Sequence, residues 1–213
     1  MRFTRILINI TIPIFLVLLF ANILTTKPYM ALSKGRYPSH EDITFDHDYA
    51  IERIIGYLNY RYDDLEFGAT ADDNSVIMRD TELSHMVDVK NLYTMLRVVG
   101  LVSGIIGGLL IYYQYRSDPK ELYKTLKWMP FGPLLFIVFV GGYILIDFNT
   151  AFTVFHELFF SNDDWLLYAD DVLIQLLPAT FWMVSGLLIL VGTTLSLSGI
   201  YLVNEKFLKK HQI

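Results

Sequence analysis

The sequence predicts a mainly α-helical membrane protein with four transmembrane helices and both termini in the cytoplasm. Of its 213 residues, 54% are hydrophobic and only 18% are charged. The apolar residues fall into long charge-free blocks instead of being spread along the chain, which is typical of membrane proteins. Lysine and arginine gather at the N-terminus, in one short connection and in the C-terminal tail, and this asymmetry predicts the orientation.

Each expected span approaches the roughly 20 apolar residues that cross a bilayer as a helix. The first apolar run follows Arg2 and Arg5. A cleaved signal peptide is the alternative, but the run is longer than a signal peptide's apolar region and no small-residue cleavage site follows, so we expect an uncleaved anchor. The expected transmembrane helices are residues 1–26, 93–115, 128–147 and 178–203, joined by 27–92, 116–127 and 148–177, with a tail at 204–213.

Basic residues predict which connections face the cytoplasm. No Lys or Arg occurs in residues 147–177, whereas residues 116–127 and the C-terminal tail are rich in them. The positive-inside rule therefore places both termini in the cytoplasm and residues 27–92 and 148–177 outside. We expect a multi-pass protein of the plasma membrane. Glycines in the second span have the small-xxx-small spacing of closely packed helices, namely Gly100, Gly104 and Gly108.

The first outer region, residues 27–92, is expected to be a small extracellular α+β unit. Residues 46–65 have helical spacing, with Asp46 as the N-cap and an apolar stripe formed by Ile51, Ile54, Ile55, Leu58 and Tyr62. Residues 65–80 suggest a weak hairpin around a polar loop. A helix capped by Ser84 is then expected to continue into the second span.

The second outer region, residues 148–177, begins with aromatic residues at helical spacing. Phe148, Phe152, Phe155 and Phe159 recur every three or four residues, which predicts a short helix lying in the membrane interface. The same helix carries His156 and Glu157, the start of the zinc motif H-E-x-x-H, but Phe160 replaces its second histidine. Pro178 is expected to break the chain before the fourth span.

Two histidines, His85 and His156, stand where the outer regions meet the membrane. Each alone is compatible with an interfacial histidine bonded to a carbonyl or a lipid headgroup. The four-span topology, however, brings both to the same side of the membrane. Asp88 follows His85 by about one helical turn and can orient its imidazole. Arg97 and Asp147 stand at the outer ends of spans two and three, either as an ion pair between helices or as part of a site.

The residue types limit the chemistry. The chain has no cysteine, which excludes a thiol nucleophile and a Cys-ligated metal, and its net charge of −5 argues against a nucleic-acid partner. No phosphate-binding loop or serine nucleophile motif is present. Imidazoles suit general acid–base catalysis near neutral pH. Such a site succeeds without a protein nucleophile when the substrate supplies one, as in an intramolecular transfer.

Three stretches resemble the lipoprotein intramolecular transacylase family of Gram-positive bacteria: ELSHMVDVK, FNTAFTVFHELFFSNDDWLL and DVLIQLLP. With the four-span layout, the resemblance covers the whole chain. It implies an acyltransferase that moves an O-acyl chain from the diacylglyceryl group of a lipoprotein to the α-amino group of its N-terminal cysteine, giving the lyso-form lipoprotein. The implied partners are that lipoprotein and membrane lipids, at the extracellular face, and neither a metal nor another cofactor is expected.

The resemblance also implies roles for individual residues. His156 is expected to be the general base and His85 the donor to the developing oxyanion or the leaving oxygen. The implied supporting residues are Asp88 for His85, Glu157 or Asp147 for His156, Arg97 for negative charge in the intermediate, and Phe152, Phe155 and Phe159 for the acyl chains. The sequence departs from the family pattern at Tyr168, Ala169 and Ala179, so Asp170 and Asp171 are poor candidates for family roles.

Two other functions stay open. One is a metal-dependent membrane lipid hydrolase in which His85, His156 and a carboxylate bind zinc. The other is a non-catalytic scaffold that binds lipid or protein. A transporter is disfavoured because no charged residue lies in the middle of any expected span.

Overall fold

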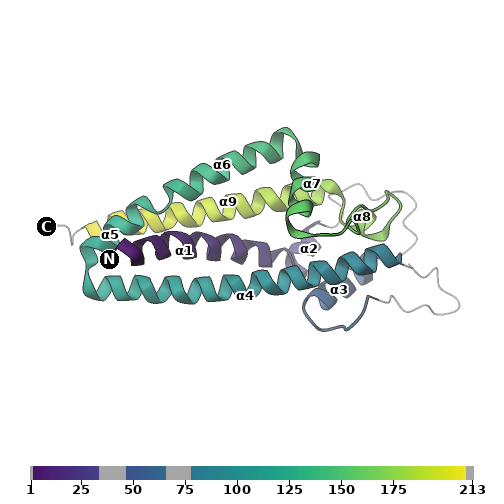
Figure 1. Cartoon of the computed structure of the whole chain (residues 1–213), viewed down its shortest axis with the longest axis horizontal. Helices are drawn as coiled ribbons and strands as arrows, with labels where there is room; N and C mark the ends of the chain where they lie inside the picture. The colour runs from purple at the N-terminus through teal and green to yellow at the C-terminus, as the bar shows by residue number, and fades with distance from the viewer. Residues whose placement is uncertain (1, 34–46, 66–77, 210–213) are drawn as a thin grey trace. The chain divides into compact units, whose positions relative to one another are not determined.

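The structure is a computed structural model that describes residues 2–33, 47–65 and 78–209. Over these ranges the chain is helical and contains no strand. The elements, labelled in Figure 1, are α1 (Arg2–Ile23), α2 (Lys27–Ser33), α3 (His47–Leu58), α4 (Asp80–Ser117), α5 (Pro119–Trp128), α6 (Phe131–Ile146), α7 (Phe148–Phe159), α8 (Val172–Leu176), α9 (Ala179–Val203) and the π-helical turn η1 (Asn204–Leu208).

Four helical stretches are long and apolar enough to cross a membrane. They are Arg2–Ile23, Asp80–Ser117, Pro119–Ile146 and Ala179–Leu208. The prediction of four spans in a mainly α-helical protein is therefore confirmed. The third stretch begins with α5, within the residues 116–127 expected as a connection, and Asp118 caps α5 by accepting a hydrogen bond from the backbone N–H of Glu121. The orientation of the termini stays a prediction.

The start of α4 differs from the expected helix start. The expected continuation into the second span is correct, since α4 is a single helix of 38 residues. Ser84 does not cap it, because the helix already begins at Asp80 and Ser84 lies inside it. The expected α+β character is not supported, since the described residues contain no strand. Most of the proposed hairpin, and the proposed cap Asp46, fall outside the described residues.

Contacts between residues divide the chain into two compact units. The first comprises Met1–Ala21, Leu96–Ile146 and Gly186–Ile213, and therefore most of the apolar spans. The second comprises Asn22–Met95 and Asp147–Ser185, and therefore the two regions expected outside. Both histidines of interest belong to the second unit.

In the first unit, glycines of α4 allow close packing against α1. A Cβ atom at Gly104 would lie 2.7 Å from the Phe15 ring, and one at Gly100 would lie 3.2 Å from Cβ of Leu18. These two expected packing positions are confirmed. The third is wrong: among the described residues nothing lies within 4 Å of a Cβ at Gly108, whereas one at Gly107 would lie 2.6 Å from Cδ1 of Ile12.

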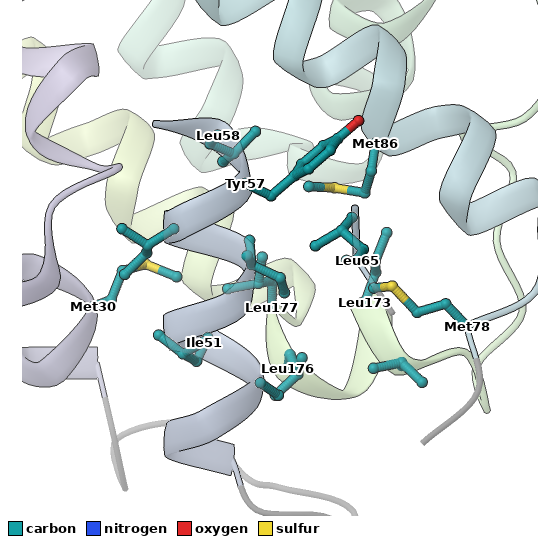
Figure 2. Close-up of a cluster of buried hydrophobic side chains, with 14 of the residues drawn as sticks. Met30, Ile51, Tyr57, Leu58, Leu65, Met78, Met86, Leu173, Leu176 and Leu177 are labelled. Atoms are coloured by element: carbon teal, nitrogen blue, oxygen red, sulfur yellow. The ribbon is translucent and has the colours of Figure 1, made fainter. Parts of the chain in front are cut away.

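In the second unit, helices distant in sequence share one hydrophobic core. The expected apolar stripe of α3 is buried, with Ile51, Ile54, Ile55 and Leu58 each less than a tenth exposed, whereas Tyr62 lies beyond the helix end. Figure 2 shows Met30 of α2, Met86 of α4 and the leucines of α8 around α3. Through Met86, this core packs against the part of α4 that carries His85.

The segment after the third span forms the expected short helix. Asp147 caps α7 by accepting a hydrogen bond from the backbone N–H of Thr150, 3.0 Å away. Pro178 separates α8 from α9, as predicted, because proline cannot continue the helix before it. The location of α7 in the membrane interface stays a prediction.

Candidate active site

His85 and His156 meet in the second unit. His85 lies in the second turn of α4, ahead of its apolar stretch at 98–115, and His156 lies near the end of α7. Their ring centroids are 5.9 Å apart and the ring planes are inclined by 37°. The residues are only 8% and 7% exposed. Two buried imidazoles from different helices can therefore reach one small molecule.

The imidazole of His156 is oriented by its own helix. Its Nδ1 is 2.7 Å from the carbonyl oxygen of Phe152, one turn earlier in α7. A carbonyl oxygen only accepts hydrogen bonds, so Nδ1 carries the proton in the neutral ring and the lone pair is on Nε2. This tautomer presents Nε2 as a proton acceptor, which is what a general base requires.

Aromatic rings surround His156. The Phe152 ring centroid is 4.0 Å from that of His156, and Trp165 stacks on the imidazole at 4.9 Å with 30° between the planes. Phe155 and Phe160 follow at 5.3 and 5.6 Å. Phe160 also packs edge-on against His85 at 5.1 Å. Two phenylalanines of the FHELFF stretch, Phe155 and Phe160, thus line the histidine site together with Phe152 and Trp165.

Burial keeps both imidazoles neutral near pH 7. It lowers the pKa of His156, and the hydrogen bond to the Phe152 carbonyl opposes this effect in part. Burial, followed by repulsion from His156, lowers the pKa of His85 to about 4, against the smaller attraction of Asp88 and Asp164. Proton transfer is most effective when the pKa of the group lies near the working pH. With a pKa of about 4, His85 is therefore poorly matched to act as a base near neutral pH.

Asp88 does not orient His85 by a hydrogen bond to Nδ1. Its carboxylate accepts a hydrogen bond from Nδ2 of Asn162, 2.8 Å away. Nδ1 of His85 is buried and has no hydrogen-bond partner among the described residues. Three-residue spacing puts Asp88 and His85 on neighbouring parts of α4. The hydrogen-bond partner of Asp88, however, comes from a loop distant in sequence.

The other expected supporting residues have partners of their own or are exposed, and of these Phe155 also contacts His156. Asp147 caps α7 and also accepts a hydrogen bond from the Thr150 hydroxyl at 2.6 Å. Glu157 is exposed, and the carbonyl of Phe152 occupies the position at Nδ1 that an orienting carboxylate would take. Arg97 belongs to the first unit. Phe155 and Phe159 stack at 4.8 Å and remain 46% and 40% exposed.

Comparisons with known proteins identify the family. A family model described as lipoprotein intramolecular transacylase Lit matches residues 3–182. The chain belongs to this transacylase family. An uncharacterized protein of Aquifex aeolicus is 29% identical over 135 residues, which are 61% of this chain and 59% of that relative. The chain thus spans less than two thirds of the curated relative that it matches.

Solved structures of the transacylase Lit from Bacillus cereus share the fold. One superposes with a TM-score of 0.81 at 21% identity and covers 99% of this chain and 97% of the other. A histidine-to-arginine variant of the same protein gives a TM-score of 0.75, covering 99% and 93%. The membrane-integral relative and the four apolar helices together support a multi-pass membrane protein.

The candidate site includes residues that were not predicted from the sequence. Trp165 and Phe160 contact the imidazoles, and Asn162 and Asp164 bond to residues flanking His85. All four lie within the FNTAFTVFHELFFSNDDWLL stretch that carried the family resemblance. Periodicity could not find them, because residues 160–165 are outside the helix.

A buried glutamate also connects two helices next to the site. Glu82 is 1% exposed and accepts hydrogen bonds from the backbone N–H groups of Arg79 at 2.8 Å and Leu173 at 2.9 Å. It therefore caps the start of α4 and the start of α8 at once. Arg79 in turn forms ion pairs with Asp170 and Asp171, so both aspartates make local structural contacts.

The described part of the chain contains no group of three His, Asp or Glu side chains that could hold a metal ion. The two histidines are grouped instead with aromatic rings. This arrangement fits acid–base chemistry in an apolar surrounding.

Proposed function

We propose that this protein is a membrane acyltransferase that moves an O-acyl chain from the diacylglyceryl group of a lipoprotein to the α-amino group of its N-terminal cysteine. The observation that carries the proposal is the pair of buried imidazoles, 5.9 Å apart, in a chain of the transacylase family. The product is an N-acyl, lyso-form lipoprotein. A substrate that contains both ester and amine lets such a site work without a protein nucleophile.

The reaction balances within one substrate molecule. The α-ammonium group, with a pKa of roughly 7.7–8.0, loses a proton, and the amine attacks the ester carbonyl carbon. Nε2 of His156 accepts the proton released as the C–N bond forms. The bond between the carbonyl carbon and the glyceryl oxygen then breaks, and that oxygen receives a proton to become a hydroxyl. The acyl chain ends as an amide, and the mass of the molecule is unchanged.

His85 is the proposed partner in this proton transfer. It is neutral near pH 7 because burial lowers its pKa to about 4. A neutral imidazole can donate its N–H to the oxyanion of the tetrahedral intermediate. Once protonated it is a strong acid for its type and readily protonates the leaving glyceryl oxygen.

The phenylalanines of α7 divide into two proposed roles. Phe152 packs on His156 and supplies the carbonyl that orients it. Phe155 and Phe159 stack on each other and remain partly exposed, so they are the proposed contacts for an acyl chain. The positive-inside rule supports placing this site at the extracellular face, where diacylglyceryl lipoproteins reside.

Mass spectrometry tests the proposal directly. A synthetic diacylglyceryl lipopeptide is incubated with the purified protein in lipid nanodiscs, and fragmentation locates each acyl chain. The expected product has the mass of the substrate, with one chain on nitrogen. A lipopeptide with a blocked α-amino group must not react. Loss of an acyl chain as free fatty acid, together with bound zinc and inhibition by a chelator, would instead identify the metal-dependent hydrolase.

A further inference from the structure

The loop at 161–165 is fastened to α4 on both sides of His85. Nδ2 of Asn162 donates to Oδ2 of Asp88 at 2.8 Å. The hydroxyl of Ser84 donates to Oδ2 of Asp164 at 2.6 Å. Ser84 and Asp88 are four residues apart, so they lie one above the other on the same face of α4. The loop therefore follows the part of α4 that carries His85.

The same loop has an internal brace and ends at the indole that contacts His156. Oδ1 of Asn162 accepts a hydrogen bond from the backbone N–H of Asp164 at 3.1 Å, as in an Asx-turn. Asn162 thus uses its oxygen within the loop and its nitrogen on Asp88. Next in the chain is Trp165, whose ring stacks on His156 at 4.9 Å.

We infer that the hydrogen bond between Asn162 and Asp88 positions Trp165, and that Trp165 holds the His156 imidazole in its working orientation. Asp88, Asn162 and Trp165 are then positioning residues for the acyl transfer, an assignment that rests on the proposed function. The Phe152 carbonyl fixes one ring nitrogen, and the indole restrains the plane of the ring. The indole face also stabilises the imidazolium that forms when His156 accepts a proton.

The inference assigns Asp88 a route to the reaction other than direct contact with His85. Its Oδ2 is engaged by Asn162, and no described residue bonds to Nδ1 of His85. The charge of Asp88 still acts on His85, but it is a smaller influence than burial. Action through Asn162 and direct action on His85 predict different outcomes when the side chains of Asp88 and Asn162 are exchanged.

A swap of the two side chains separates these routes. Asn162→Asp keeps an oxygen for the internal brace but places a carboxylate opposite Asp88, so the donor is lost and like charges repel. The double variant Asp88→Asn/Asn162→Asp restores one donor and one acceptor with the original net charge. Ser161→Asp is the matched control, because it adds the same charge at an exposed neighbouring residue.

Fluorescence of Trp165 gives a readout independent of activity. The chain has three tryptophans, so Trp128→Phe/Trp182→Phe leaves Trp165 as the only indole. A protonated imidazole quenches an indole stacked on it. We expect the fluorescence of Trp165 to be quenched as pH falls. His156→Gln and Asn162→Asp should each abolish this quenching. The double variant Asp88→Asn/Asn162→Asp should restore it. Asn162→Asp should also shift the emission to longer wavelength as the partly buried indole becomes more exposed to water.

Turnover completes the test. We expect Asn162→Asp to lower kcat about 10- to 100-fold with little change in KM, since misplacing a reacting group costs this much. The swap should recover most of kcat, and Ser161→Asp should match the parent. Unchanged emission in Asn162→Asp overturns the inference, as does a swap variant that regains neither emission nor turnover. If no variant, including the parent, transfers an acyl chain, the proposed function fails while fluorescence still decides the positioning of Trp165.

Discussion

The imidazoles of His85 and His156 lie 5.9 Å apart between centroids, although α4 and α7 are separate helices. Two neutral imidazoles at this distance can accept one proton and donate another without carrying two positive charges together. Repulsion between the two rings when both are protonated contributes to the low pKa of His85. The pair therefore suits a reaction in which a proton enters and leaves the site in turn.

Replacing His156 with glutamine should lower turnover about 10²- to 10⁴-fold, because a positioned general base contributes that much. Glu157→Gln, at the next residue, should stay close to the parent, because the Phe152 carbonyl already orients His156. Initial rates of N-acylation, measured by mass spectrometry on folded variants, check both. A large loss of turnover in Glu157→Gln would show that Glu157 orients His156, as the sequence suggested.

The pH dependence of kcat/KM should follow the substrate amine. Both histidines have pKa values below 6.5, so they are already neutral where the α-ammonium begins to lose its proton. The rate should rise with pH through roughly 7.7–8.0 and then level off. A substrate analogue with a hydroxyl in place of the amine should lose this rise. A midpoint near 6.5 with both substrates would show that a histidine limits the rate instead.

Acid should destabilise the fold through His85. Its pKa is about 4 when folded and about 6.5 when unfolded, so the unfolded chain binds an additional proton between these values. The free energy of unfolding therefore falls as pH drops from about 6.5 to 4, by about 3 kcal/mol for this group. His85→Gln removes this contribution. Thermal unfolding in detergent at pH 7 and pH 5 should show a smaller loss in the variant, and equal losses would contradict the assignment.

The apolar spans and the amphipathic helix could be predicted from sequence because their signals are periodic and strong. Hydropathy located the four spans, and the stripe of Ile51, Ile54 and Ile55 identified the buried face of α3. The approach of His85 and His156 was expected from the topology. Each of these features depends on patterns that many residues share, so a few atypical positions do not hide them.

Individual partners could not be predicted, since they depend on single contacts across the fold. Asp88 shares a helix face with His85, yet it bonds to Asn162 from a distant loop. His156 is oriented by a main-chain carbonyl, which every residue has and no motif marks. The glycine spacing predicted close packing, but the face of α4 that meets α1 includes Gly107 and leaves Gly108 open.

Replacing Glu82 with alanine should destabilise the protein by about 2–4 kcal/mol. The variant loses a helix cap, worth about 1 kcal/mol, and leaves the N–H of Leu173 buried without a partner, at about 1–3 kcal/mol. Asp80→Asn, on the same turn of α4 but exposed, should cost less than about 1 kcal/mol. Hydrogen exchange at Arg79 and Leu173 should accelerate in Glu82→Ala only. Similar exchange in both variants would show that Glu82 does not cap both helices.

Gly107→Ala and Gly108→Ala should have opposite effects on stability. A Cβ at Gly107 would lie 2.6 Å from Cδ1 of Ile12 and 2.9 Å from the Thr11 hydroxyl, so these side chains must shift, and such overpacking costs about 1–3 kcal/mol. At Gly108 no described atom outside the neighbouring backbone of α4 lies within 4 Å of such a Cβ, and alanine favours a helix by up to about 1 kcal/mol. Thermal unfolding of the two variants in one detergent measures the difference. Equal destabilisation would mean that α1 packs on a different face of α4 and that Gly107 does not set the approach of the two helices.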